Sequence, residues 1–230
     1  MRLHLSAIAA LALFAAPGDA ATRNFTVTGF DRIRVDGPYR VKLTTGVAPF
    51  ATADGSPAAL DAVSLEVQGR TLIIRRKAAV QSNSTQRSGP VSIVVGTHEL
   101  AAAWLNGSGG LAVNAVKGRT FELAVSGSGA AEVGKINVDR LRVAISGSAS
   151  VVLGGTAEIA TFSVRGPSAL DASALSAEAA TIAAEGSSTL KLTATGTAKV
   201  DARGLATIDL AGKPACTIRP NSTAEVSGCR

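Results

Sequence analysis

The stretch VSGSGAAEVG, Val125 to Gly134, recurs in altered form through the second half of the chain. Related stretches are NGSGGLAVN from Asn106, ISGSASVVL from Ile145, RGPSALDAS from Arg165 and EGSSTLKLT from Glu185. The first glycine of each stretch, together with Gly204, belongs to a series with spacings of 20, 20, 19, 20 and 18 residues. The series is Gly107, Gly127, Gly147, Gly166, Gly186 and Gly204. A fixed period near twenty residues indicates a solenoid of repeated coils.

Apolar residues flank each of these glycines at fixed offsets. The positions four and two residues before it, and four and six after it, hold only Ala, Val, Leu, Ile or Phe. Charged residues such as Glu132, Asp171 and Lys191 stand between them. Alternation on both sides of a corner is the pattern of paired strands. We therefore predict an all-β fold, a right-handed parallel β-helix with about 20 residues per coil, in which a looser connection closes each coil.

The Gly-Ser stretches are interpreted as corners of this solenoid. Glycine adopts backbone angles that other residues resist, and the small residues after it allow close stacking. A phosphate loop is excluded because the Walker lysine and a following helical pattern are missing. The template also fits Gly37, which Ile33 and Val35 precede and Val41 and Leu43 follow. Gly37 is therefore predicted to be a seventh corner glycine.

The region between Gly37 and the repeats is less regular. VSLEVQGRTLIIRRK predicts a hairpin that turns at Gln68 and Gly69, and VSIVV from Val91 predicts a strand. The polar segment 78–90 is expected to be an exposed loop. We expect one domain over residues 21–230, with an irregular part at about 22–100, regular coils at about 101–215 and a C-terminal tail.

The N-terminus predicts export. Residues 1–20 contain one Arg, an apolar run from Leu5 to Ala16 and small residues before Ala20, as in a secretory signal peptide. A short buried helix is the alternative. No later apolar run approaches the length of a membrane span. The expected location is the periplasm or the outer cell surface.

The two cysteines, Cys216 and Cys229, are predicted to form a disulfide that closes the tail, as expected in an exported protein. The net charge of +6 comes from scattered residues. It either favours an anionic surface or serves solubility, and without a basic stripe it predicts no nucleic-acid binding. With His98 the only histidine beyond residue 20, no metal site or cofactor is predicted.

The order of motifs resembles an exported bacterial family, the GIN domain or auto-transporter adhesin head domain. The stretches on which this resemblance rests are FDRIRVDGPYRVKL from Phe30 to Leu43, the strand pair VSLEVQGRTLIIRRK, and the GSG corners at Gly107 and Gly127. Later corners drift to GSAS, GPSA and GSST. The resemblance implies a β-helical fold and an envelope location, and no established activity.

The search for catalytic residues identifies no cluster. Outward carboxylates such as Asp171 and Glu185 occupy different columns, and no column is expected to join two adjacent acids with a basic partner. We therefore expect a non-catalytic, adhesin-like protein that binds a polysaccharide, another envelope component or a second copy of itself. The alternative is a polysaccharide lyase or hydrolase that uses those carboxylates.

Trp104 is the candidate contact residue because it stands out of phase with the buried positions Ala103 and Leu105 and should point outward. Coverage by the loop at 78–90 is the alternative.

Overall fold

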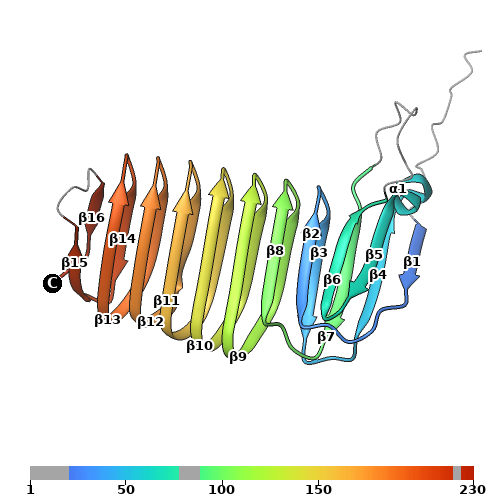
Figure 1. The fold of residues 1–230 in the computed structure, drawn as a ribbon, viewed down its shortest axis with the longest axis horizontal. Coiled ribbons are helices and arrows are strands. Elements are labelled where there is room, and N and C mark those ends of the chain that lie inside the picture. The colour runs from blue at the N-terminus through green and yellow to red at the C-terminus, as the bar shows by residue number, and fades with distance from the viewer. Residues whose placement is uncertain (1–20, 78–88, 220–223) are drawn as a thin grey trace, which may run out of the picture.

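The chain folds almost entirely into β-strands. The computed structural model describes residues 21–77, 89–219 and 224–230, and strands make up 73% of it against 3% helix. The strands form one elongated sheet system that winds into a solenoid of about 6 turns (Figure 1). The predicted all-β solenoid with roughly 20 residues per coil is confirmed. Its right-handed sense stays a prediction.

Five long strands each make most of one coil. They are β9 (Gly110–Gly127), β10 (Ala130–Gly147), β11 (Ser150–Arg165), β12 (Ala169–Glu185) and β13 (Thr189–Arg203), and each pairs in parallel with the next. The shorter strands β8 (Ala102–Gly107) and β14 (Thr207–Ala211) flank this series. Parallel stacking satisfies the backbone amide and carbonyl groups between coils.

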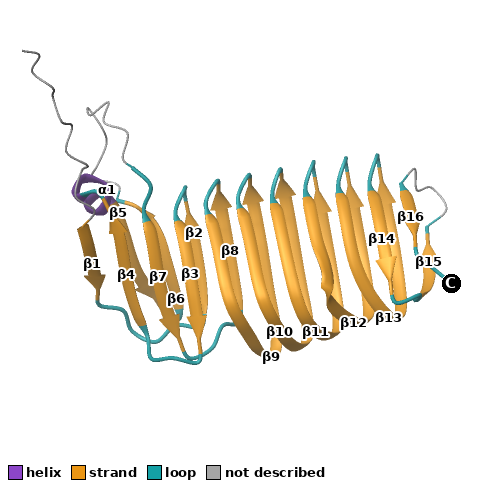
Figure 2. Cartoon of the chain, turned by 180° about the vertical axis from the view of Figure 1, so that it is seen from behind, coloured by secondary structure: helices purple, strands orange, loops and turns teal. Residues whose placement is uncertain are grey.

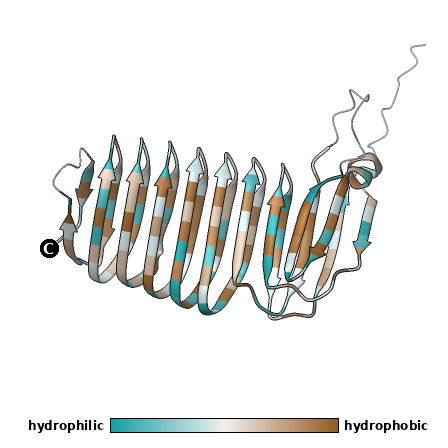
Figure 3. Cartoon of the chain, in the orientation of Figure 1, coloured by the Kyte–Doolittle hydropathy of each residue, from teal (hydrophilic) through white to brown (hydrophobic). Residues whose placement is uncertain are grey.

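Two walls enclose the core. The segments that follow each corner glycine form wall A, and the segments that precede the next corner glycine form wall B. Buried and exposed residues alternate along both walls. Hydrophobic and hydrophilic residues alternate along the same strands (Figure 3). Every position of the predicted apolar columns is buried, as in the stacked pair Val133 and Leu153, which are 1% and 0% exposed.

The connection between the walls differs from the prediction. It is part of a continuous strand that bends, and its residues stay paired with the neighbouring coil, as Lys135 does with Ala115 of the preceding coil. Val116 and Ile136 form a further buried column there. The register shifts between β10 and β11, between β11 and β12 and between β12 and β13 also fall on this side. Coils of unequal length therefore differ at the bend, while their corners stay aligned.

The corner glycines lie along the opposite edge, where the loops in Figure 2 form a row. All six in the repeats have positive φ between 87° and 113°, and Gly37 has φ 128°. Successive corners are hydrogen-bonded, since the Ser148 amide donates to the Gly127 carbonyl oxygen over 2.8 Å. Glycine is needed because this conformation and this backbone contact both disfavour a side chain.

The first coil in the sequence is not at the end of the stack. β2 (Arg32–Asp36) pairs with β8 and with β6 (Thr71–Arg76), while β3 (Arg40–Thr45) pairs with β9 and with β7 (Ser92–Thr97). Residues that come later in the chain therefore cover it. The coil of β2 and β3 comes first in the sequence. The next segments, up to β7, form a cap on it, and only then does the chain continue the regular stack at β8.

That cap is antiparallel. On wall A, β1 (Ala21–Phe25) pairs with β4 (Phe50–Gly55), which pairs with β7. On wall B, β5 (Val63–Gln68) and β6 form the predicted hairpin, with Gly69 at φ 61° in its turn. The short helix α1 (Pro57–Ala62) begins after Ser56, whose hydroxyl accepts a hydrogen bond from the Ala59 amide.

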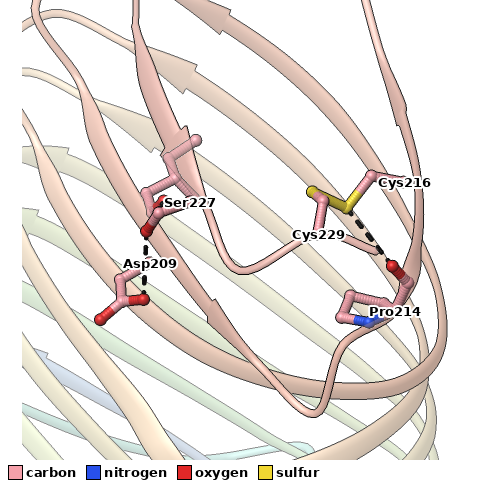
Figure 4. Close-up of a disulfide and its surroundings, with 6 residues drawn as sticks. Asp209, Pro214, Cys216, Ser227 and Cys229 are labelled. Atoms are coloured by element: carbon pink, nitrogen blue, oxygen red, sulfur yellow. Dashed lines mark hydrogen bonds between the residues drawn. A yellow bond between two sulfur atoms is a disulfide. The ribbon is translucent and has the colours of Figure 1, made fainter.

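The opposite end carries β15 (Ala215–Ile218) and β16 (Glu225–Ser227), which pair with β13 and β14. Cys216 and Cys229 are joined by a disulfide with a Cα–Cα distance of 5.7 Å (Figure 4). The Ser227 hydroxyl donates to Asp209 Oδ1 over 3.2 Å. The disulfide closes the tail on itself, while the strand pairing and the Ser227 hydrogen bond hold the tail against the last coils. The predicted signal segment 1–20 and residues 78–88 of the predicted loop lie outside the described residues.

Candidate binding site on the outer wall

The core is occupied by aliphatic side chains and a few aromatic ones, which the stacked coils bury. The outward positions of the two walls are therefore the surfaces that can meet a partner. Each wall is a ladder of parallel strands, so one outward position per coil forms a row along the solenoid. The chemistry of a row is decided by which residues the register aligns.

Trp104 lies on wall B, in β8, between Arg34 of β2 and Ala124 of β9. Its side chain points outward, as the alternation predicts, and is half-buried. It lines a shallow hollow of about 440 Å³ together with Arg34, Gln68, Thr71, Ile73 and Asn106. The hollow therefore combines an indole ring with groups from β2, β8 and the β5–β6 hairpin.

A polar network holds two of these side chains. Arg34 Nε lies 2.9 Å from Asp36 Oδ2 and 3.0 Å from Oδ1. Asn106 Nδ2 donates to Asp36 Oδ1 over 2.6 Å. One carboxylate thus orients a guanidinium and an amide on neighbouring strands. Sequence reasoning missed this network because Asp36 and Asn106 are far apart in the sequence and only the β2–β8 register pairs them.

A larger hollow of about 640 Å³ lies on wall A. Its outward side chains include Arg40 and Lys42 of β3 and Glu132 of β10. Gly110 and Ala112 of β9 lie between these strands in the register, so small residues form the floor between longer ones. The repeats in the sequence reveal the small residues of this floor. They do not reveal that β3 pairs with β9.

The carboxylates considered for catalysis lie on opposite walls. Asp171, on wall A, accepts hydrogen bonds from the Ser173 hydroxyl over 2.6 Å and the Ser173 amide over 3.0 Å. These bonds lower the pKa of Asp171, with a smaller contribution from the charge of Lys191. Glu185, on wall B, forms an ion pair with Arg165 at 3.3 Å. The fold does not bring the two carboxylates together.

The expectation that no column joins acids with a basic partner was wrong. The register pairs on either side of these positions, without a shift between them, place Arg119, Asp139, Glu158 and Glu178 in one column on four successive coils. The three acids line a hollow of about 280 Å³ with polar side chains such as Thr156. The spacings of 20, 19 and 20 residues were visible in the sequence. They were overlooked because the bend was expected to be a loose connection.

His98 is exposed near the bend between the two walls, in a small hollow with Asn114 and Lys117. Across residues 21–77, 89–219 and 224–230, no three His, Cys, Asp or Glu side chains are grouped in a way that could hold a metal ion. Within the same ranges, no helix is long and apolar enough to cross a membrane.

The fold and its outer hollows define a class: an elongated β-solenoid with an apolar core and shallow hollows on its outer surface. The chain belongs to the family described as "Putative auto-transporter adhesin, head GIN domain", whose model matches residues 29–214. The resemblance found in the sequence is thereby confirmed. Comparison with curated proteins gave no match.

Solved structures show the same fold. The "putative adhesin" of Bacteroides fragilis has a TM-score of 0.79 at 20% identity and covers 93% of this chain and 95% of its own. A "putative adhesin" of Parabacteroides merdae has a TM-score of 0.70 at 19% identity, with 91% and 97% covered. A "putative lipid binding protein" of Parabacteroides distasonis has a TM-score of 0.70 at 21% identity, with 91% and 97% covered. At these identities the likeness concerns the fold.

Proposed function

We propose that this protein is exported to the cell envelope and acts there as a non-catalytic, adhesin-like binding protein. The observation that carries the proposal is the hollow around Trp104, which sets an indole ring and oriented polar groups on the outside of a solenoid whose core is filled. The family description and the names of the similar structures support the same role.

Two features support export. The sequence of residues 1–20 has the pattern of a signal peptide. The Cys216–Cys229 disulfide is consistent with an oxidising compartment, because disulfides are rare in reducing cytosol. Expression of the chain from Met1 in a bacterial host, followed by fractionation and N-terminal sequencing, tests this part. We expect a periplasmic or surface protein that starts near Ala21, whereas an uncleaved cytosolic product would contradict the proposal.

Binding and turnover are tested together. The protein, produced without residues 1–20, is applied to an array of polysaccharides and to isolated envelopes, and parallel samples are assayed for new reducing ends and for unsaturated sugar products. We expect binding without turnover. Turnover that is lost in Asp171→Asn would instead favour the lyase or hydrolase alternative. Absence of both, with a dimer or trimer by light scattering, would favour self-association as the role.

A further inference from the structure

We propose that the hollow beside Trp104 is a carbohydrate site, in which one sugar ring stacks on the indole and its hydroxyl groups meet the side chains around it. This inference rests on the proposed binding function and gives it a ligand class and a location. The hollow is formed by β6, β2 and β8 on wall B, with Gln68 at the end of β5.

Small side chains follow Trp104 along its row on wall B. On the side of the regular coils, the register aligns Ala124 of β9 and then Ala144 of β10 with it. These small side chains form a low surface next to a large ring. The face of an indole ring carries a negative quadrupole, and the C–H groups on one face of a pyranose carry partial positive charge. An extended sugar chain can therefore lie along the row with one ring over Trp104.

The polar groups around the ring are suited to hydroxyl groups. Asp36 engages Arg34 through Nε, so the two terminal guanidinium nitrogens are outside that contact. Asn106 donates to Asp36 through Nδ2, which leaves its carbonyl oxygen as an acceptor. Hydroxyl groups both donate and accept, so they match this mixture. Because Asp36 already orients both side chains, little conformational entropy is lost when a ligand binds.

The opposite rim adds further groups of the same kind. Gln68 and Thr71 flank the turn of the β5–β6 hairpin and contribute an amide and a hydroxyl to the lining. Ile73 lies beside Arg34 in the register and supplies an apolar contact. One aromatic face, several uncharged polar groups and one cation in a shallow hollow favour a saccharide over an apolar ligand.

The experiment uses the single tryptophan. Because Trp104 is the only tryptophan of the chain, its fluorescence reports on this hollow without labelling. The protein is titrated with cellotetraose, chitotetraose and tetragalacturonate, and the same glycans are immobilised for a direct binding measurement. We expect at least one glycan to change the emission at the concentration at which it binds. A stronger response to tetragalacturonate that weakens with salt would assign Arg34 to a carboxylate, and equal responses would assign it to hydroxyl groups.

Variants measured by calorimetry locate the site. Trp104→Ala is expected to lower the affinity about tenfold or more, Trp104→Phe to lower it less, and Arg34→Gln to lower it several-fold. Arg165→Gln is the matched control, because it removes another arginine–carboxylate pair on wall B, away from the hollow. Circular dichroism confirms that each variant is folded.

The outcomes separate the two proposals. Glycan binding that leaves the emission unchanged and survives Trp104→Ala would overturn this site and keep the binding function. Failure of all three glycans, with binding to isolated envelopes intact, would overturn the carbohydrate assignment alone. Failure of glycans and envelopes together would overturn the proposed function as well.

Discussion

Gly147 lies directly over Gly127, the corner glycine of the preceding coil. A Cβ atom on Gly147 would therefore come within 2.4 Å of the Gly127 carbonyl oxygen. The Ser148 amide donates to that same oxygen. The corner therefore stacks backbone on backbone, and the repeating glycine has a steric cause in addition to its positive φ of 107°.

Gly147→Ala is accordingly expected to destabilise the protein by about 1–3 kcal/mol or more, since strain adds to a steric clash. Urea unfolding measures it. Gly110→Ala is the matched control, because its Cβ would meet nothing closer than the Ala130 carbonyl oxygen at 3.9 Å. Equal unfolding midpoints for the two variants would show that the corners do not need glycine.

Val133→Asp places a charge in the filled core. Val133 is 1% exposed and stacks between Val113 and Leu153. An unpaired buried carboxylate costs several kcal/mol, so we expect the variant not to fold. Glu132→Ala, one residue away and exposed, is expected to change the unfolding midpoint little. Similar thermal stability of both variants would mean that the inward and outward positions are exchanged.

Reduction of the Cys216–Cys229 disulfide is expected to destabilise the C-terminal tail. A closed loop of this length contributes about 3 kcal/mol in the chain-entropy model. The Cys216→Ser and Cys229→Ser double variant should therefore lose protection from amide exchange in β15 and β16 first, since these strands pair only with the last coils. Mass measurement after alkylation without reductant checks the bond itself, and two modified thiols in exported protein would contradict it.

Asp171 is expected to titrate below its ordinary value of 3.8, because the Ser173 hydroxyl and amide hydrogen-bond to its carboxylate. A lowered folded-state pKa stabilises the fold at pH above the unfolded value, and this contribution disappears as the pH falls through the folded pKa. Ser173→Ala should raise the pKa of Asp171 toward 3.8, as followed by NMR titration of the side-chain carboxyl. An unchanged pKa in this variant would mean that another group sets it.

Much of the fold could be predicted because the repeat encodes it locally. Each coil carries its own corner glycine and its own inward residues, and stacking identical columns buries them without reference to distant segments. The bend was harder to predict because coils of 18 to 20 residues differ there by bulges. The column of Asp139, Glu158 and Glu178 was hidden for that reason.

Of the residues that line the candidate site, only Trp104 was singled out from the sequence. The phase of Ala103 and Leu105 places Trp104 outside, which the sequence alone could establish. Its neighbour Arg34 depends on the coil of β2 and β3 being enclosed between the regular stack and an antiparallel cap. No local pattern specifies that order.

The amino-acid sequence thus determined by itself the corners, the filled core and the outward position of Trp104, because alternation and a fixed period act within each coil. Only the tertiary structure decided which side chains surround Trp104, because Arg34, Asp36 and Asn106 meet through the pairing of strands that lie far apart in the chain.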